Sequence, residues 1–178
     1  IIFPTDTVYS FGCDIRSKDA IERIYRIKNI DRKKPLSFIF ADISSMSSYV
    51  HNMSDQAFKI MRKVFPGPYT IILNASKKVP AHVTTKQKTL GVRIPDCPAA
   101  LALVRELGAP LLCSSVDTPE DEYLVDPLEL PRNIDVDLLL YAGARREELS
   151  TMIDCTGADP VLLRQGKGGI DFIQGVIT

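Results

Sequence analysis

Hydroxyl and cationic side chains recur beside the short apolar segments of this chain. The hydroxyl groups belong to Thr5, Thr7, Ser114, Ser115 and Ser150, and the cations are Lys28, Arg32, Lys34, Arg93 and Arg164. An arginine binds a carboxylate or a phosphate through two parallel hydrogen bonds, and hydroxyls complete such a site. Gathered at the ends of strands, these residues would bind carboxylate and phosphate groups. Each residue alone also has an ordinary structural role, because strand threonines form cross-strand hydrogen bonds.

The sequence lacks the motifs of several common enzyme classes. It has no G-x-x-x-x-G-K-[ST] phosphate loop, no G-x-G-x-x-G, no H-E-x-x-H and no G-x-S-x-G. Two isolated histidines and four separated cysteines offer little material for a metal shell or a Cys–His pair. We therefore assign no residue as a catalytic acid, base or nucleophile and none as a metal ligand. Free, buried thiols favour a reducing, cytoplasmic compartment; they are Cys13, Cys97, Cys113 and Cys155.

Length and composition predict a soluble globular protein, either a single domain over residues 1–178 or two tightly fused halves. The chain is 45% apolar and 25% charged, and its apolar runs are far shorter than the roughly 18 residues of a membrane span. The net charge is zero, but residues 56–95 hold eight Lys or Arg and no acid, whereas residues 96–137 hold ten Asp or Glu. The basic segment favours a polyanionic partner such as RNA, although a solvated charged surface is the simpler alternative.

Capping residues and periodicity predict three helices. One covers 18–28 after Ser17, one begins near Ser54 and ends before Pro66, and one begins near Pro98 and ends at Gly108. Strands are expected in the opening stretch and at 36–40, 69–73, 90–95, 110–115, 136–141, 151–155 and 161–164. This alternation predicts an α/β protein with a large twisted, mixed sheet.

Several motifs, in order and at similar spacing, resemble the YrdC-like family of threonylcarbamoyl-adenylate synthases. They are FPTDTVYSFGCD, IYRIKNIDRKKPL, FPGPYTIIL, GVRIPDCPAALALVRELGAPLLCSS, STMIDCT and VLLRQG, and together they cover nearly the whole chain. The resemblance implies a twisted mixed sheet with flanking helices around a concave, positively charged cavity. A further helix and strand usually precede the first strand of that fold, so the resemblance also implies that N-terminal elements are missing here.

The implied activity is that of a nucleotidyltransferase, the L-threonylcarbamoyladenylate synthase. It joins L-threonine, bicarbonate and ATP with Mg²⁺, and a partner transferase then modifies adenosine 37 of tRNA to threonylcarbamoyladenosine. An enzyme accelerates such a reaction mainly by aligning the reactants and neutralising the charge of the phosphate groups. The resemblance implies that threonine is bound by Thr5, Thr7, Arg93 and Ser115. It implies that the nucleotide is bound by Lys28, Arg32, Lys34, Ser114, Ser150 and Arg164.

Departures from the family motifs resemble a YciO-like branch. Ile30 occupies the third position of K-x-R, Ser114 to Asp117 replace T-S-A-N, Ser10 replaces a glycine, and Ile39 replaces a polar residue. Three alternatives follow. The chain is a synthase, or a YciO-like paralogue that binds a nucleotide or adenylate with altered catalysis, or a module that binds tRNA or double-stranded RNA through the basic surface from Arg62 to Arg93.

Overall fold

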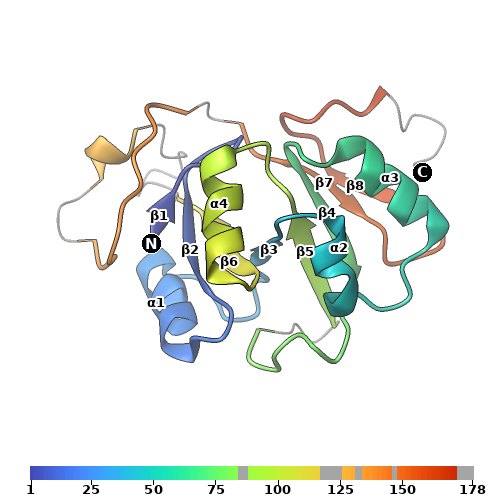
Figure 1. The fold of residues 1–178 in the computed structure, drawn as a ribbon, viewed down its shortest axis with the longest axis horizontal. Coiled ribbons are helices and arrows are strands. Elements are labelled where there is room, and N and C mark those ends of the chain that lie inside the picture. Colours follow the sequence, from blue (N-terminus) through green and yellow to red (C-terminus); the bar gives the residue numbers. More distant parts are fainter. Residues whose placement is uncertain (84–87, 117–125, 131–133, 146–147, 172–178) are drawn as a thin grey trace.

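The computed structural model describes residues 1–83, 88–116, 126–130, 134–145 and 148–171. Within these ranges the chain forms one mixed sheet with helices packed against it (Figure 1). The strands are Ile2–Phe3 (β1), Ser10–Asp14 (β2), Ser37–Ile39 (β3), Tyr69–Asn74 (β4), Thr89–Arg93 (β5), Leu111–Ser115 (β6), Thr151–Asp154 (β7) and Val161–Arg164 (β8). The helices are Lys18–Lys28 (α1), Ile43–Met46 (α2), Asp55–Val64 (α3) and Pro98–Leu107 (α4), with 3₁₀ turns at Ser47–Tyr49 (η1) and Pro127–Glu129 (η2).

The strand order in the sheet is β1-β2-β6-β3-β5-β4-β7-β8. β3 pairs with β5 and β4 pairs with β7 in parallel, and the other neighbours pair antiparallel. The predicted mixed α/β architecture is confirmed. Six of the predicted strand segments are also confirmed, as β3 to β8.

The predicted helix boundaries are confirmed, and local hydrogen bonds explain them. The Ser17 and Ser54 side chains accept hydrogen bonds from the backbone amides three residues later, which caps α1 and α3. Pro98 opens α4, and Gly108 ends it in the left-handed conformation with φ of 64°. Each helix therefore starts and stops where its capping residues require.

Two predictions about strands are wrong. Residues 136–141 form no strand, and Leu139 contributes one isolated parallel bridge to Ile2 instead. The opening stretch is not one strand, because Pro4 to Tyr9 leave the sheet between β1 and β2. The structure also adds α2 in the Ser-rich connection, where the side chains of Asp42 and Ser45 cap each other's backbone amides.

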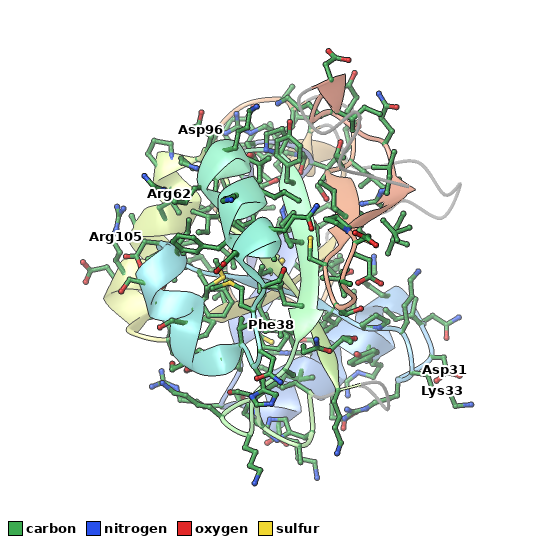
Figure 2. All side chains as sticks on the ribbon, turned by 90° about the vertical axis from the view of Figure 1, so that its right-hand side faces the viewer. Asp31, Lys33, Phe38, Arg62, Asp96 and Arg105 are labelled. Carbon is green, nitrogen blue, oxygen red and sulfur yellow. The ribbon has the colours of Figure 1, made fainter. Side chains whose placement is uncertain are left out.

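The two faces of the sheet have different coverings. Phe38 and its neighbours on one face pack with Ile24 of α1 and Met61 of α3, and Figure 2 shows Phe38 in the interior. On the other face, Ile39 packs with Val104 of α4, which lies over β2 and β6 in Figure 1. Strand residues alternate between faces, so Ser37 shares the α4 face but lies beyond the helix. That uncovered part of the sheet holds the candidate site.

Candidate functional site

A cavity of about 200 Å³ opens over the end of the sheet that α4 leaves uncovered. Its lining comes from seven strands, the segments beside them and the last residue of α1, so residues distant in sequence meet on one surface. The lining residues are Val8, Ser10, Lys28, Lys34, Pro35, Ser37, Thr70, Arg93, Cys113, Ser114, Ser115, Leu149, Ser150, Met152 and Arg164.

Strand register builds the floor of this cavity from small side chains. Ser10 lies opposite Ser115, and Ser37 lies opposite both Cys113 and Gly91. A Cβ at position 91 would lie 3.4 Å from the Ser37 Oγ and 3.2 Å from a methyl carbon of Thr70. Because Gly91 has no side chain, it leaves space between Ser37 and Thr70 in the middle of the sheet.

Four cationic side chains and no carboxylate line the cavity among the described residues. Lys28 ends α1, and its Nζ donates a hydrogen bond to the Ser115 carbonyl at 2.6 Å. Asn29 follows in the left-handed conformation, which turns the chain back toward the sheet. Lys34 returns to the cavity in this turn, where the Tyr25 hydroxyl donates to its carbonyl oxygen at 2.8 Å. The cavity thus has the charge expected of an anion site.

Arg93 is held at the end of β5 by two residues of the β1–β2 segment. Its Nη2 lies 3.0 Å from Asp6 Oδ1 and 3.1 Å from Thr7 Oγ1. Thr5 Oγ1 lies 2.9 Å from Thr7 Oγ1 and donates to the Val8 carbonyl, so the hydroxyls form a directed chain behind the guanidinium. The buried Arg93 Nε has no hydrogen-bond partner in the described part of the molecule. A buried donor without an acceptor is costly, and Arg93 is a cavity-lining residue that carries one.

The opposite end of the cavity contains a pair of buried hydroxyls. Thr70 Oγ1 and Ser150 Oγ lie 2.8 Å apart. The guanidinium of Arg164 reaches across from β8 and donates to the Ser150 carbonyl through Nε at 3.1 Å and Nη2 at 3.0 Å. This arrangement fixes Arg164 against the wall.

The structure brings together seven of the ten residues predicted for the site. They are Lys28, Lys34, Arg93, Ser114, Ser115, Ser150 and Arg164. Thr5 and Thr7 lie behind the wall, where they support Arg93 instead of lining the cavity. Arg32 also lies outside the lining: its guanidinium pairs with Glu22 of α1 and stacks over Tyr25. The binding roles predicted for all ten residues remain predictions.

Sequence reasoning missed eight of the fifteen lining residues. Three of these carry hydroxyl groups, namely Ser10, Ser37 and Thr70. The available signal for Thr70 was its place in the PGPYT motif, and Ser10 was noted only as a departure from a glycine. Ser37 carried no signal, because a lone serine in an apolar strand has no distinctive spacing. Asp117, which replaces the last residue of T-S-A-N, lies outside the described residues.

The remaining reactive side chains lie buried. All four cysteines are free and buried, as predicted, and burial raises the pKa of Cys113 to about 11. The Cys113 thiol therefore stays protonated at neutral pH. In the described ranges, no group of three or more His, Cys, Asp or Glu side chains is arranged to hold a metal ion. None of the helices described there has the length and apolar character to cross a bilayer.

Comparison with YciO shows extensive similarity. The chain is 37% identical to Escherichia coli YciO over 174 residues, which cover 96% of this chain and 84% of that protein. The crystal structure of E. coli YciO superposes with a TM-score of 0.88 over 96% of this chain and 84% of that one, at 36% identity.

Synthases of threonylcarbamoyl-AMP are also similar. The Bacillus subtilis enzyme is 30% identical over 181 residues, or 99% of this chain and 52% of the enzyme. Pyrococcus abyssi Sua5 complexed with L-threonine superposes with a TM-score of 0.90 at 26% identity, over 99% of this chain and 54% of that one. The chain thus spans about half the length of these synthases. A family model named Sua5_yciO_yrdC and described as "Telomere recombination" matches residues 1–166, and the chain belongs to this Sua5/YciO/YrdC family.

Proposed function

We propose that the cavity binds L-threonine and ATP and that the protein catalyses the formation of threonylcarbamoyl-AMP from them and bicarbonate. The observation that carries this proposal is the set of four cations around a floor of hydroxyls, one of which, Arg93, has a buried Nε without an acceptor. Similarity to a Sua5 complexed with L-threonine supports the same assignment. The synthase product supplies the threonylcarbamoyl group of tRNA threonylcarbamoyladenosine, which requires a separate partner transferase.

In this mechanism the protein aligns the reactants and neutralises charge. The threonine amine attacks the carbon of bicarbonate and water leaves, which gives a carbamate. A carbamate oxygen then attacks the α-phosphorus of ATP, and pyrophosphate leaves. The Arg93 guanidinium would bind the threonine carboxylate, while Lys28 and Lys34 would neutralise the phosphates.

We place Mg²⁺ with the substrate. The cavity lining contains hydroxyls and cations but no carboxylate among the described residues, so it does not form a cage for a divalent cation. Mg²⁺ usually binds through substrate phosphates and keeps several waters. It would therefore enter as the ATP complex and balance the phosphate charge that Lys28 and Lys34 leave.

The test is pyrophosphate release from Mg-ATP and bicarbonate, with and without L-threonine. Release that depends on threonine, together with a threonylcarbamoyl-AMP product identified by mass spectrometry, is the expected result. L-Serine and L-valine serve as matched amino acids that lack the methyl or the hydroxyl group of threonine. Release at the same rate without any amino acid would contradict the proposal.

A second candidate is a YciO-like protein that binds a nucleotide or adenylate with weak or altered turnover. The pairing of Arg32 with Glu22 favours it, because it directs one predicted phosphate ligand away from the cavity. The 84% coverage of YciO, against about half of each synthase, points the same way. ATP binding without threonine-dependent release would select this candidate. RNA binding through the basic segment and a cytoplasmic location also remain predictions.

A further inference from the structure

Asp6 is a buried counter-charge directly behind the cavity. Its side chain is 5% exposed and that of Arg93 is 8% exposed. The two side chains meet at 3.0 Å, and Asp6 does not itself line the cavity. Arg93 therefore faces a ligand with its own charge already compensated from the rear.

The Asp6 carboxylate is held in place from several directions. Its Oδ2 accepts a hydrogen bond from the Asp96 backbone amide at 3.0 Å. Beside it, the Cys97 thiol donates to the Pro4 carbonyl at 3.5 Å, and the Lys167 ammonium contacts the Asp6 carbonyl. These contacts join the β1–β2 segment to the residues that follow β5 and to Lys167 after β8, and they hold the Asp6 carboxylate beside Arg93.

The second lysine of the cavity has a different electrostatic setting. Lys34 forms no ion pair with any described residue, whereas Arg93 forms a buried one. Coulomb repulsion from Asp6 grows with the charge on the ligand, because each added negative charge interacts with the same fixed carboxylate. At the Arg93 end an anion is attracted by the guanidinium and repelled by Asp6, whereas Lys34 has no such opposing charge. The electrostatic preference for Lys34 therefore doubles from a carboxylate with one charge to a phosphate dianion.

From this geometry we infer that Asp6 is a specificity-determining residue, which positions Arg93 and reserves its end of the cavity for a monoanionic carboxylate. Phosphate groups are thereby directed toward Lys34. The inference rests on the proposed function, since it names which part of the site takes threonine and which takes ATP. Asp6 acts through Arg93 and is a positioning residue. Rejection of the wrong anion by a fixed like charge is a recognised source of specificity.

The test compares the affinities of two probes, L-threonine and inorganic pyrophosphate, by calorimetric titration of the full chain. In Asp6→Asn, pyrophosphate should bind about threefold or more tighter than to the wild type, because a negative charge is removed. L-Threonine should bind about tenfold weaker, because Arg93 loses its anchor. Asp96→Asn is the matched control: it removes one exposed carboxylate nearby (Figure 2) and keeps the amide that Asp6 accepts from. The affinities of Asp96→Asn for L-threonine and for pyrophosphate should both stay within about twofold of those of the wild type.

A folded Asp6→Asn protein that keeps the wild-type ratio of the two affinities would overturn the inference, and so would equal weakening of both. If Asp6→Asn does not fold, Asp6→Glu decides: it keeps the charge but shifts Arg93, so threonine should weaken while pyrophosphate stays unchanged. Tighter pyrophosphate binding by Asp6→Glu would also overturn the inference.

Failure of the proposed function would give a different result, because the wild type itself would then bind no threonine. In that case the pyrophosphate comparison still tests Asp6.

Discussion

The hydroxyls of Thr70 and Ser150 lie 2.8 Å apart although 80 positions separate them in the chain. Thr70 belongs to β4, and Ser150 immediately precedes β7, which pairs with β4 in parallel. The same Ser150 accepts two hydrogen bonds from Arg164 through its carbonyl. One buried contact between two strands therefore sets the position of a cation at the end of the cavity.

Thr70→Val should test this linkage. Valine matches threonine in shape and replaces the hydroxyl by a methyl group, which breaks the hydrogen bond to Ser150, so the free energy of unfolding should fall by about 1 kcal/mol. ATP affinity should fall about threefold, because Arg164 loses part of its support. Urea unfolding and calorimetric titration measure the two effects. Ser44→Ala removes an exposed hydroxyl on α2 and serves as the control; an equal loss of ATP affinity there would contradict the linkage.

Arg93→Ala should abolish threonine-dependent pyrophosphate release. The variant also leaves the Asp6 carboxylate buried without its partner, which should lower the free energy of unfolding by about 3 kcal/mol. Arg93→Lys separates the effects, since it keeps a charge near Asp6 but lacks the two-pronged guanidinium. It should fold more stably than the alanine variant and still lose at least about tenfold in threonine-dependent rate. Arg105→Ala, on the exposed face of α4 (Figure 2), is the control. Full activity in a folded Arg93→Ala protein would remove Arg93 from the site.

The basic turn after α1 allows a comparison of two neighbouring cations. Lys34 lines the cavity, whereas Arg32 pairs with Glu22. Lys34→Ala should therefore weaken ATP binding by about tenfold, and Arg32→Ala by less than about threefold. Lys33→Ala is the control, because Figure 2 shows Lys33 pointing outward from the same turn. A loss in Arg32→Ala as large as in Lys34→Ala would show that Arg32 leaves Glu22 when the nucleotide binds.

Much of the fold could be predicted because local physics decides it. Ser17, Ser54 and Gly108 mark helix ends through hydrogen bonds within a few residues. The strand prediction for 136–141 is wrong because this segment meets the short edge strand β1 at the single Leu139–Ile2 bridge only. The run is not buried either, because Leu138 is 49% and Tyr141 is 52% exposed, so an apolar run of this length does not by itself predict a strand.

The residues of the candidate site likewise fall into two groups: those that a sequence motif identifies, and those whose role depends on how the strands pair. Lys28 and Arg93 could be identified from motifs, since their charge and spacing are visible in the sequence. Ser37 and Gly91 could not, because their role comes from strand register, which pairs them with each other across β3 and β5. The supporting role of Thr5 and Thr7 likewise depends on a contact with Arg93 that spans more than 80 positions.

The depth of the cavity floor leads to a prediction for Gly91. In Gly91→Ala the added methyl would lie 3.2 Å from both the Thr70 and Ile72 side chains and 3.4 Å from Ser37. This contact raises the floor, so threonine and ATP affinities should fall by about tenfold while the free energy of unfolding falls by about 1 kcal/mol. Gly169→Ala, where a Cβ meets open space, should change neither. Unaltered ligand affinities in Gly91→Ala would mean that ligands do not reach this floor.

Cys113 should make stability depend on alkaline pH. Burial raises the pKa of its thiol from 9.0 to about 11, so the unfolded chain loses this proton at lower pH than the folded one. The stabilisation is therefore complete below pH 9 and is lost as the pH rises toward 11, by about 1.4 kcal/mol per pH unit. Cys113→Ala lacks this contribution, whereas the other titrating groups are common to both proteins. The difference in free energy of unfolding between wild type and variant, measured by urea unfolding under reducing conditions, should shrink by about 1 kcal/mol between pH 9 and pH 10, because the unfolded thiol is already half ionised at pH 9. A difference that stays constant over this range would contradict a thiol that remains buried and protonated.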